Sequence, residues 1–300
     1  MLTGLLKAKQ YDLIHTHFSK DLWVLVPALH YLRLDTPLIL TKHMESAVIK
    51  KDYLHNKLYR RLNYVLAISN RIKENVSQTC PVSDEKIVLH YTGVDFNKYD
   101  PVNGNREKVR NEFHIKEDEI VIGILARITY GKGYEELLHS AAILNKEYTN
   151  LKFLLVGDSS PDEKEYCNEI KKLAVDLSLG DKIIFTGFRE DTENVLSAMD
   201  IFTFPSYAES FGNALVEAMA MEKPAVGTNS HGVLDIIDDE GNGYFFNKKD
   251  QGSLADKIRL LINSPEKRSV IGKAARQSVI AKFDFEKQTE KLIDLYKKLV

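Results

Sequence analysis

Short runs of β-branched and other apolar residues alternate along the chain with longer amphipathic segments. This alternation is typical of parallel βα units, in which a buried strand is followed by a helix that covers the sheet. In the first third of the chain the pattern predicts strands at residues 11–16, 38–41, 64–68 and 87–90. The amphipathic segments there predict helices at residues 47–63 and 70–79.

A polar stretch at residues 95–106, which contains Pro101 and Gly104, separates this series from a second one. The second series predicts strands at 120–126, 151–157, 183–187, 201–205, 225–227 and 244–246, with helices at 133–147, 163–177, 193–199, 212–221, 252–263 and 265–282. Six strands with intervening helices predict a complete Rossmann-like domain. We therefore expect an N-terminal domain at residues 1–100, a second domain at 101–283, and a C-terminal helix within 284–300 that packs back on the first domain.

Composition and charge narrow the classes of function. A content of 44% hydrophobic and 28% charged residues suits a globular protein with two cores, and a net charge of -2 gives no indication of nucleic-acid binding. Residues 1–100 hold 14 Lys and Arg against 10 Asp and Glu, a net +4, which leaves -6 for residues 101–300. Lys50, Lys51, Lys57, Arg60 and Arg61 suggest peripheral contact with an anionic membrane, and ordinary solvated helix faces are the competing explanation.

The cysteines and the apolar runs indicate the compartment. Cys80 and Cys167 lie far apart without a CxxC pair, which argues against a disulfide framework and suits a reducing environment. The N-terminal residues lack the apolar stretch of a signal peptide, and the longest apolar run, residues 23–29, is interrupted by Pro27. We expect a cytoplasmic protein, peripheral at the inner face of the membrane if its basic face binds lipid.

Several kinds of chemistry are not predicted. The chain has no G-x-G-x-x-G after a strand and no Walker A loop, so hydride transfer and P-loop phosphate binding are disfavoured. His15 and His17 lie at a strand end without a third ligand at matching spacing, and the acidic run at 238–240 is best explained as a turn. We therefore expect no metal and no cofactor.

The segment after the predicted strand 201–205 carries the most chemistry. Glu209 lies in the loop, Gly212 opens a helix, and Glu217 follows about one turn into that helix. Both carboxylates can face one crevice beyond the carboxyl end of a parallel strand, where open α/β sheets bind ligands. The amides at 211–213 suit a diphosphate or a sugar hydroxyl, and the Glu217 carboxylate can accept two hydrogen bonds from a vicinal diol.

A second strand-to-helix loop, residues 126–133, carries Arg127 and Lys132. If this loop faces the same crevice, the two cations would neutralise charge on a departing diphosphate without a metal. Taken singly, each of these charged residues is better explained as a solvated surface group or a structural ion pair. Their order on strand-end loops favours a functional site.

The segment from Glu209 to Glu217 resembles the Glu-x7-Glu motif of the retaining family 4 glycosyltransferases. Further matches lie at 126–127, 132–133, 156–158, 185–188, 199–206, 222–224 and 241–244, and at 91–95 near the domain boundary. The resemblance implies an α/β protein of the GT-B fold, with two Rossmann-like domains facing across a cleft. The N-terminal domain has only four strand signals, so we expect it to be truncated, with a partner chain covering its exposed edge.

The resemblance also implies roles for individual residues. The expected catalytic residues are Glu209, Arg127, Lys132 and His43, and the expected donor-binding residues are Glu217, Ser210, Phe211, Gly212, Asn213, Phe188 and Arg189, the last two framing the base. By the same resemblance, Arg127 and Lys132 bind the diphosphate and Glu217 the ribose, while Glu209 holds the transferred sugar. His43 would face that sugar, and a satisfied buried histidine explains it about equally well.

The implied function is a retaining, metal-independent transfer of a hexosyl unit from a UDP- or GDP-sugar. The acceptor would be a glycan or a lipid-linked molecule in cell-envelope or polysaccharide synthesis. The main alternative is a non-catalytic donor-binding subunit that regulates a full-length glycosyltransferase. A GT-B sugar-nucleotide epimerase is a third possibility that the order of the motifs favours less.

Overall fold

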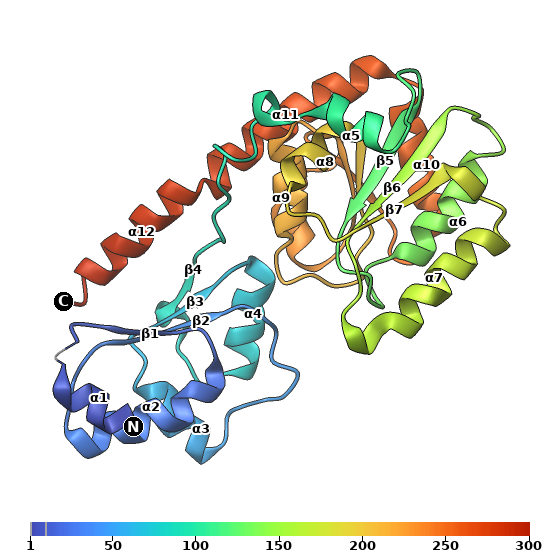
Figure 1. Ribbon diagram of the computed structural model, residues 1–300. Coiled ribbons are helices and arrows are strands. Elements are labelled where there is room, and N and C mark those ends of the chain that lie inside the picture. Colours follow the sequence, from blue (N-terminus) through green and yellow to red (C-terminus); the bar gives the residue numbers. More distant parts are fainter. Residues whose placement is uncertain (1, 10) are drawn as a thin grey trace. The chain divides into compact units, whose positions relative to one another are not determined.

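The computed structural model describes residues 2–9 and 11–300 (Figure 1). The chain divides into two compact units, unit 1 with Met1–Gly93 and Phe285–Val300, and unit 2 with Val94–Asp284. Each unit contains one sheet of parallel strands covered by helices, which is the α/β architecture expected from the alternating pattern. Within the part of the chain that is described, no helix combines the length and apolar composition needed to cross a bilayer.

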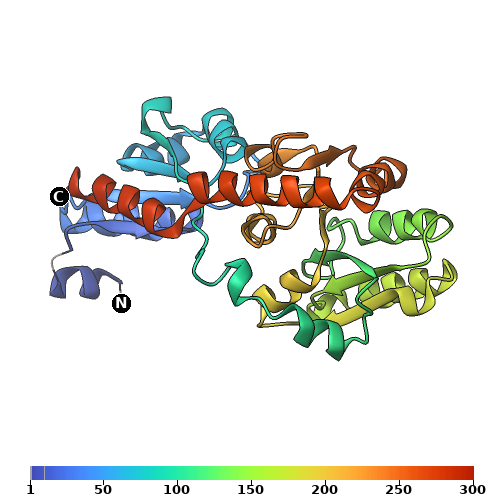
Figure 2. The same ribbon diagram turned by 90° about the horizontal axis from the view of Figure 1, so that it is seen from above.

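Unit 1 contains a four-stranded sheet in the order β1-β2-β3-β4. The strands are β1 (Ile14–Thr16), β2 (Leu38–Lys42), β3 (Tyr64–Ala67) and β4 (Ile87–Leu89), and the helices are α1 (Leu2–Ala8), α2 (Leu22–Leu32), α3 (Tyr53–Arg60), α4 (Asn70–Thr79) and α12 (Phe285–Lys297). All residues of β2 are buried, as expected for an inner parallel strand. The C-terminal helix α12 lies over this sheet (Figure 2), and its Tyr296 hydroxyl hydrogen-bonds to Nδ1 of His15 at 2.5 Å.

Two helices of unit 1 differ from the prediction. Helix α3 begins at Tyr53 rather than at residue 47, because the Asp52 side chain caps it by accepting hydrogen bonds from the amides of Leu54 and His55. Residues 43–52 therefore form a loop, which is anchored by the Lys50 amide on the Thr79 carbonyl at 2.7 Å. Helix α2 was not predicted, and it forms although it contains Pro27.

Unit 2 contains a six-stranded parallel sheet in the order β10-β9-β8-β5-β6-β7. The strands are β5 (Ile120–Leu125), β6 (Leu151–Val156), β7 (Ile183–Gly187), β8 (Ile201–Phe204), β9 (Ala225–Thr228) and β10 (Tyr244–Phe246). From β5 the chain adds β6 and β7 on one side, then returns to add β8, β9 and β10 on the other. This is the doubly wound order, and β5 and β8 flank the point where the direction reverses.

Helices cover both faces of the unit 2 sheet (Figure 1). They are α5 (Arg106–Glu112), α6 (Tyr134–Leu144), α7 (Lys164–Asp176), α8 (Thr192–Ala198), α9 (Asn213–Ala220), α10 (Gln251–Ile262) and α11 (Pro265–Phe283). Short 3-10 turns in the two units lie at Ser19–Asp21, Asp84–Lys86, Pro101–Asn103, Pro161–Glu163, Gly180–Lys182 and His231–Asp235. The helices from α6 onward agree with the prediction except at their ends.

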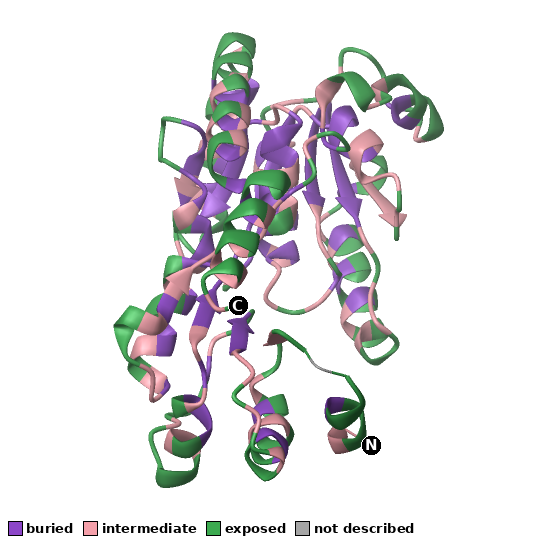
Figure 3. Cartoon of the chain, turned by 90° about the vertical axis from the view of Figure 1, so that its left-hand side faces the viewer, coloured by how far each residue is buried: buried purple, intermediate pink, exposed green. Residues whose placement is uncertain are grey.

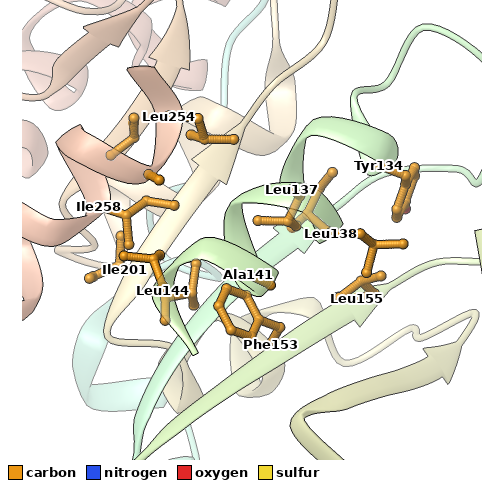
Figure 4. Packing of buried hydrophobic residues seen from close by; sticks show 14 of the residues in the cluster. Tyr134, Leu137, Leu138, Ala141, Leu144, Phe153, Leu155, Ile201, Leu254 and Ile258 are labelled. Carbon is orange, nitrogen blue, oxygen red and sulfur yellow. The ribbon is translucent and has the colours of Figure 1, made fainter. Parts of the chain in front are cut away.

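The core of unit 2 lies between the sheet and the helices α6 and α10 (Figure 4). Helix α6 buries Tyr134, Leu137, Leu138, Ala141 and Leu144, which recur at helical spacing on one face. They pack on strand residues and on the apolar face of α10. Strands β6, β8 and β9 are buried along their length and β7, at the edge, is only half-buried, whereas the outer faces of the helices are exposed (Figure 3). This packing holds the strand ends, and the loops that follow them, in fixed positions.

Helix α5 was not predicted, because its sequence has no apolar period and begins inside the polar stretch. It is held instead by hydrogen bonds from two arginines. Arg106 and Arg110 both pair with Asp200, at 2.8 and 3.5 Å, and Arg110 also donates to the carbonyls of Lys116 and Glu119 at 2.6 Å each. Charge-assisted hydrogen bonds of this kind do not depend on a periodic spacing of apolar residues, so the hydrophobic pattern could not predict this helix.

Candidate functional site

A cavity of about 880 Å³ opens in unit 2 at the carboxyl ends of its strands. Its lining consists of Leu125, Ala126 and Arg127 at the end of β5, Val156, Gly157, Asp158, Ser159 and Ser160 at the end of β6, Phe188, Arg189, Glu190 and Thr192 after β7, Asn213, Ala214 and Glu217 on α9, and Lys98 and Tyr99 before α5. The cavity includes the loop after β5 and the helix after β8, which flank the reversal of strand order. Open α/β sheets bind ligands at this position.

Arg127 and Glu217 line this cavity together, so the structure brings residues from the two separate motifs to one space. Glu217 lies about one turn into α9, as its spacing from Gly212 predicted. Burial raises the pKa of the Glu217 carboxyl, and a hydrogen bond with Tyr99 and the charge of Lys98 oppose that rise. The cavity thus offers a guanidinium for an anion and a buried carboxylate that can accept from hydroxyl groups.

The start of α9 adds backbone donors to the cavity. The first hydrogen bond within this helix runs from the Leu215 amide to the Gly212 carbonyl at 3.1 Å, so the amides of Asn213 and Ala214 precede it. Asn213 and Ala214 line the cavity. Gly212 has a φ of +123°, which lets the chain enter the helix where an L side chain would be strained.

Three expected donor-binding residues just before α9 lie outside the lining of the cavity: Ser210, Phe211 and Gly212. The Phe211 side chain is buried, and its ring packs edge-on against Phe283 with the ring centroids 5.1 Å apart. Phe211 therefore fixes the entry to α9 through the core. A contribution to binding from Phe211 or Gly212 would come from the backbone.

Lys132 and Glu209 form an ion pair with each other, and neither lines the cavity. Their loops are also joined by a hydrogen bond from the Tyr207 amide to the Gly131 carbonyl at 2.7 Å. Gly133 permits this approach, because a Cβ there would lie 2.3 Å from the Pro205 carbonyl oxygen. The structure thus brings the loop after β5 onto the loop after β8, with the two charges mutually neutralised.

Phe188 and Arg189 both line the cavity at the end of β7. Phe188 is 74% exposed, so its ring is free to stack on a planar ligand. The Arg189 guanidinium pairs with Glu112 at 2.5 Å and with Asp191 at 2.8 Å, and these bonds raise its pKa. Two carboxylates already neutralise this cation, which makes it a poorer phosphate ligand than Arg127.

His43 belongs to unit 1, where it follows β2 directly. Its Nε2 lies 3.0 Å from Nδ1 of His17, so one ring donates to the other, and the two rings stack with centroids 5.2 Å apart. His17 stacks in turn on His15, at 4.5 Å. Burial and the charge of His17 lower the pKa of His43, and they lower that of His15 to about 4. The neutral form of His15 is therefore favoured at pH 7, and the surroundings of His43 shift it in the same direction.

Sequence reasoning missed part of the cavity wall. Lys98 and Tyr99 come from the polar stretch that was interpreted as a domain boundary, and the Tyr99 hydroxyl hydrogen-bonds to Oγ1 of Thr192 at 2.9 Å. Nothing in their local pattern distinguishes them from linker residues. In the described part of the chain, no cluster of three or more His, Cys, Asp or Glu is placed to hold a metal ion.

The two sheets, their topology and the cavity define a GT-B glycosyltransferase fold. The chain belongs to the family described as "Glycosyl transferases group 1", whose model matches residues 105–278. A second model, "Glycosyltransferase Family 4", matches residues 1–98. The resemblance to glycosyltransferases is thereby confirmed.

Two relatives that are named as glycosyltransferases align with most of this chain. The capsular polysaccharide biosynthesis glycosyltransferase CapM of Staphylococcus aureus is 30% identical, over 77% of this chain and 60% of its own length. The UDP-Gal:alpha-D-GlcNAc-diphosphoundecaprenol alpha-1,3-galactosyltransferase of Escherichia coli is 23% identical, over 98% of this chain and 77% of its own. The chain therefore spans less than two thirds of CapM.

Solved structures show the same fold. A glycosyltransferase from Rickettsia africae superposes with a TM-score of 0.90 at 24% identity, covering 99% of this chain and 79% of its own. Anabaena HepE in complex with UDP-glucose superposes with a TM-score of 0.86 at 24% identity, covering 99% of this chain and 81% of its own. These likenesses confirm the predicted fold class.

Proposed function

We propose that this chain transfers a hexosyl unit from a nucleotide-diphosphate sugar to a glycan or lipid-linked acceptor in polysaccharide synthesis, with retention of anomeric configuration. The observation that carries the proposal is the joint position of Arg127 and Glu217 on one cavity of about 880 Å³. A volume in this range suits a ligand of nucleotide-sugar size. The family to which the chain belongs supports the same class of reaction.

Each of the cavity residues would bind a different part of the sugar donor. Arg127 would hold the diphosphate oxygens with its two-pronged guanidinium, and the Asn213 and Ala214 amides would add the positive end of α9. Glu217 would accept from both ribose hydroxyls, while Phe188 stacks on the base. Donors fixed before reaction stabilise charge on the leaving diphosphate without reorganisation, so no metal is required.

Lys132 and Glu209 would act as a pair on the sugar side of the donor. In the structure each neutralises the other, which keeps the two side chains in place. A bound donor phosphate would share the Lys132 ammonium with Glu209, and the carboxylate would accept from a sugar hydroxyl. The pairing thus supports the roles that the resemblance implies for both residues.

The names of relatives support the choice of donor and pathway. CapM is named for capsular polysaccharide biosynthesis, the E. coli relative for galactosyl transfer from a UDP-sugar, and HepE was solved with UDP-glucose. We therefore favour a UDP-sugar over a GDP-sugar and a polysaccharide or its lipid-linked precursor as the acceptor.

Release of UDP or GDP from a panel of sugar donors, in the presence of a metal chelator and envelope glycan or lipid extracts, tests this proposal. Arg127→Ala is expected to lower the rate about 100- to 1,000-fold, because it removes charge stabilisation from the departing diphosphate. Arg259→Ala is the matched control, since Arg259 lies outside the cavity and pairs with Glu147 and Asp256 on the surface. NMR of the product gives the anomeric configuration.

The outcomes separate the competing functions. Donor-dependent release that Arg127→Ala abolishes and Arg259→Ala preserves supports a transferase. Donor binding without any release, with every acceptor tried, would instead indicate a non-catalytic donor-binding subunit. An inverted product would contradict retention while leaving the donor site intact.

A further inference from the structure

One face of unit 1 exposes large apolar side chains that a folded monomer would ordinarily bury. They are Trp23 (47% exposed), Met44 (67%), Val48 (63%), Ile49 (74%), Tyr53 (70%) and Leu54 (54%). We call these six residues, together with Lys50, Lys51 and Lys57, the 44–57 face. Isolated exposed apolar residues are common on proteins, whereas a group of this density marks a surface that binds something.

Contacts between side chains show that two helices share this face. The Trp23 ring on α2 meets the His55 ring on α3 edge-on, with centroids 5.3 Å apart. The Lys57 ammonium lies 4.7 Å from the centroid of the Tyr53 ring. Met44, Val48 and Ile49 are on the loop between β2 and α3, which joins this face directly to the start of α3.

The loop is ordered by its backbone and not by its apolar side chains. The Ser46 amide donates to Oδ1 of Asn75 at 2.7 Å, and the Lys50 amide donates to the Thr79 carbonyl at 2.7 Å. These two bonds tie the loop to α4 while Val48 and Ile49, between them, stay exposed. Hydrogen bonding thus holds apolar side chains in water, which costs free energy unless they are covered by another surface.

The electrostatics of the face favour an anionic partner. Its cations are Lys50, Lys51 and Lys57, with Arg60 one turn further along α3. The neighbouring acids are already satisfied. Glu45 accepts two hydrogen bonds from Arg71 at 3.0 and 2.8 Å, and Asp52 caps α3 and pairs with His55.

Arg61 is not part of this cationic group, although the sequence grouped it with the others. Its guanidinium donates to the carbonyls of Leu34 and Thr36, at 3.2 and 2.5 Å. It therefore joins α3 to the segment before β2, and the cations that remain available lie beside the exposed apolar residues.

From this combination we infer that the 44–57 face docks on an anionic lipid bilayer. The exposed side chains are aliphatic and aromatic groups with lysines among them, the composition that partitions into the interface of a charged membrane. The apolar residues enter the headgroup region, while Lys50, Lys51 and Lys57 contact lipid phosphates. Docking of this kind needs no sugar donor, so it stands or fails separately from the proposed function.

Co-sedimentation with phosphatidylcholine vesicles, with and without phosphatidylglycerol, tests the inference on the full chain. The wild-type protein is expected to bind the anionic vesicles, and to bind several-fold less at high salt or without phosphatidylglycerol. Val48→Ser/Ile49→Ser and, separately, Lys51→Gln/Lys57→Gln are each expected to lower the partition coefficient about tenfold. Since all four side chains are exposed, the variants should keep the wild-type thermal midpoint.

Matched controls lie in unit 2. Val175→Ser/Val270→Ser removes equally exposed valines, and Lys267→Gln/Lys273→Gln removes exposed lysines; neither pair should change vesicle binding. The inference is overturned if the wild type does not bind anionic vesicles, or if the control variants lose binding equally. It is also overturned if sedimentation velocity without lipid shows a dimer that Val48→Ser/Ile49→Ser dissociates, because the face would then join two copies of this chain.

Discussion

At the scale of single residues, the burial of Glu217 in the proposed donor site lowers the stability of the fold. Its carboxylate is buried in the wall of a cavity, where its hydrogen bond with Tyr99 and the nearby charge of Lys98 only partly replace water. Burial of a charged group is unfavourable, and here it raises the pKa of the carboxyl. A residue selected for stability alone would be neutral at this position. The charge is explained if it accepts hydrogen bonds from ligand hydroxyls.

Glu217→Gln is therefore expected to stabilise the protein by about 1 kcal/mol at pH 7.5 while weakening donor binding. Because the folded pKa is raised above the unfolded value, the wild-type carboxyl binds its proton more tightly in the folded state. The stabilisation of the variant relative to wild type should therefore disappear as the pH falls through the folded pKa to 4.5. Urea unfolding of both proteins between pH 7.5 and 4.5 measures this difference; a variant that is less stable at pH 7.5 would contradict it.

At the scale of elements, the site depends on how closely the strand ends approach each other. Gly157, directly after β6, has a φ of +137°, and a Cβ there would lie 1.9 Å from the Ala126 carbonyl oxygen. This glycine lets the loop after β6 lie against the loop that carries Arg127. Both loops line the cavity, so backbone geometry at this glycine sets the shape of the site.

Gly157→Ala is expected to lower the free energy of unfolding by about 3 kcal/mol, since the methyl group cannot be accommodated without moving backbone. Gly180→Ala is the matched control. Gly180 also has a positive φ, of +49°, but a Cβ there would meet no atom within 4 Å, so we expect a loss of about 1 kcal/mol. Equal losses in the two variants, measured by urea unfolding, would show that the approach of the two loops does not matter.

The elements also show what could be predicted from the sequence. The strands of unit 2 were predictable because their buried β-branched runs are distinct, and for the same reason Arg127 could be placed at a strand end and Glu217 in the helix that follows another strand. The neighbouring position of β5 and β8 could not be predicted, since it depends on pairing between segments far apart in the chain. The same holds for Tyr99, which reaches the cavity from a polar stretch.

Capping by one side chain explains why helix α3 is shorter than the helix predicted from the sequence. The amphipathic pattern extended the predicted helix back to residue 47, across the loop that exposes Val48 and Ile49. Asp52 accepts hydrogen bonds from two amides and so starts the helix at Tyr53, not at residue 47. A helix over residues 47–52 would have turned some of their apolar side chains towards the core. The predicted helix therefore gave no indication that Val48 and Ile49 are exposed.

At the scale of the whole molecule, the two units differ in the kind of surface that they present. Unit 2 holds a cavity at its strand ends that Arg127 and Glu217 line, and unit 1 carries histidines after β1 and β2 together with the basic, apolar 44–57 face. The family models match both units, residues 1–98 and 105–278. On these surfaces we propose that unit 2 binds the donor and that unit 1 contacts the acceptor or the membrane.

The most direct test of the donor site is isothermal titration calorimetry of the whole chain with UDP- and GDP-sugars in the presence of a metal chelator. We predict binding of one nucleotide series to the wild type, and at least a tenfold loss of affinity in Glu217→Ala, because the ribose hydroxyls lose a buried acceptor. Glu240→Ala, in an exposed turn of unit 2, should bind as the wild type does. If folded wild-type protein binds no donor, or if Glu217→Ala binds equally well, the cavity is not the donor site.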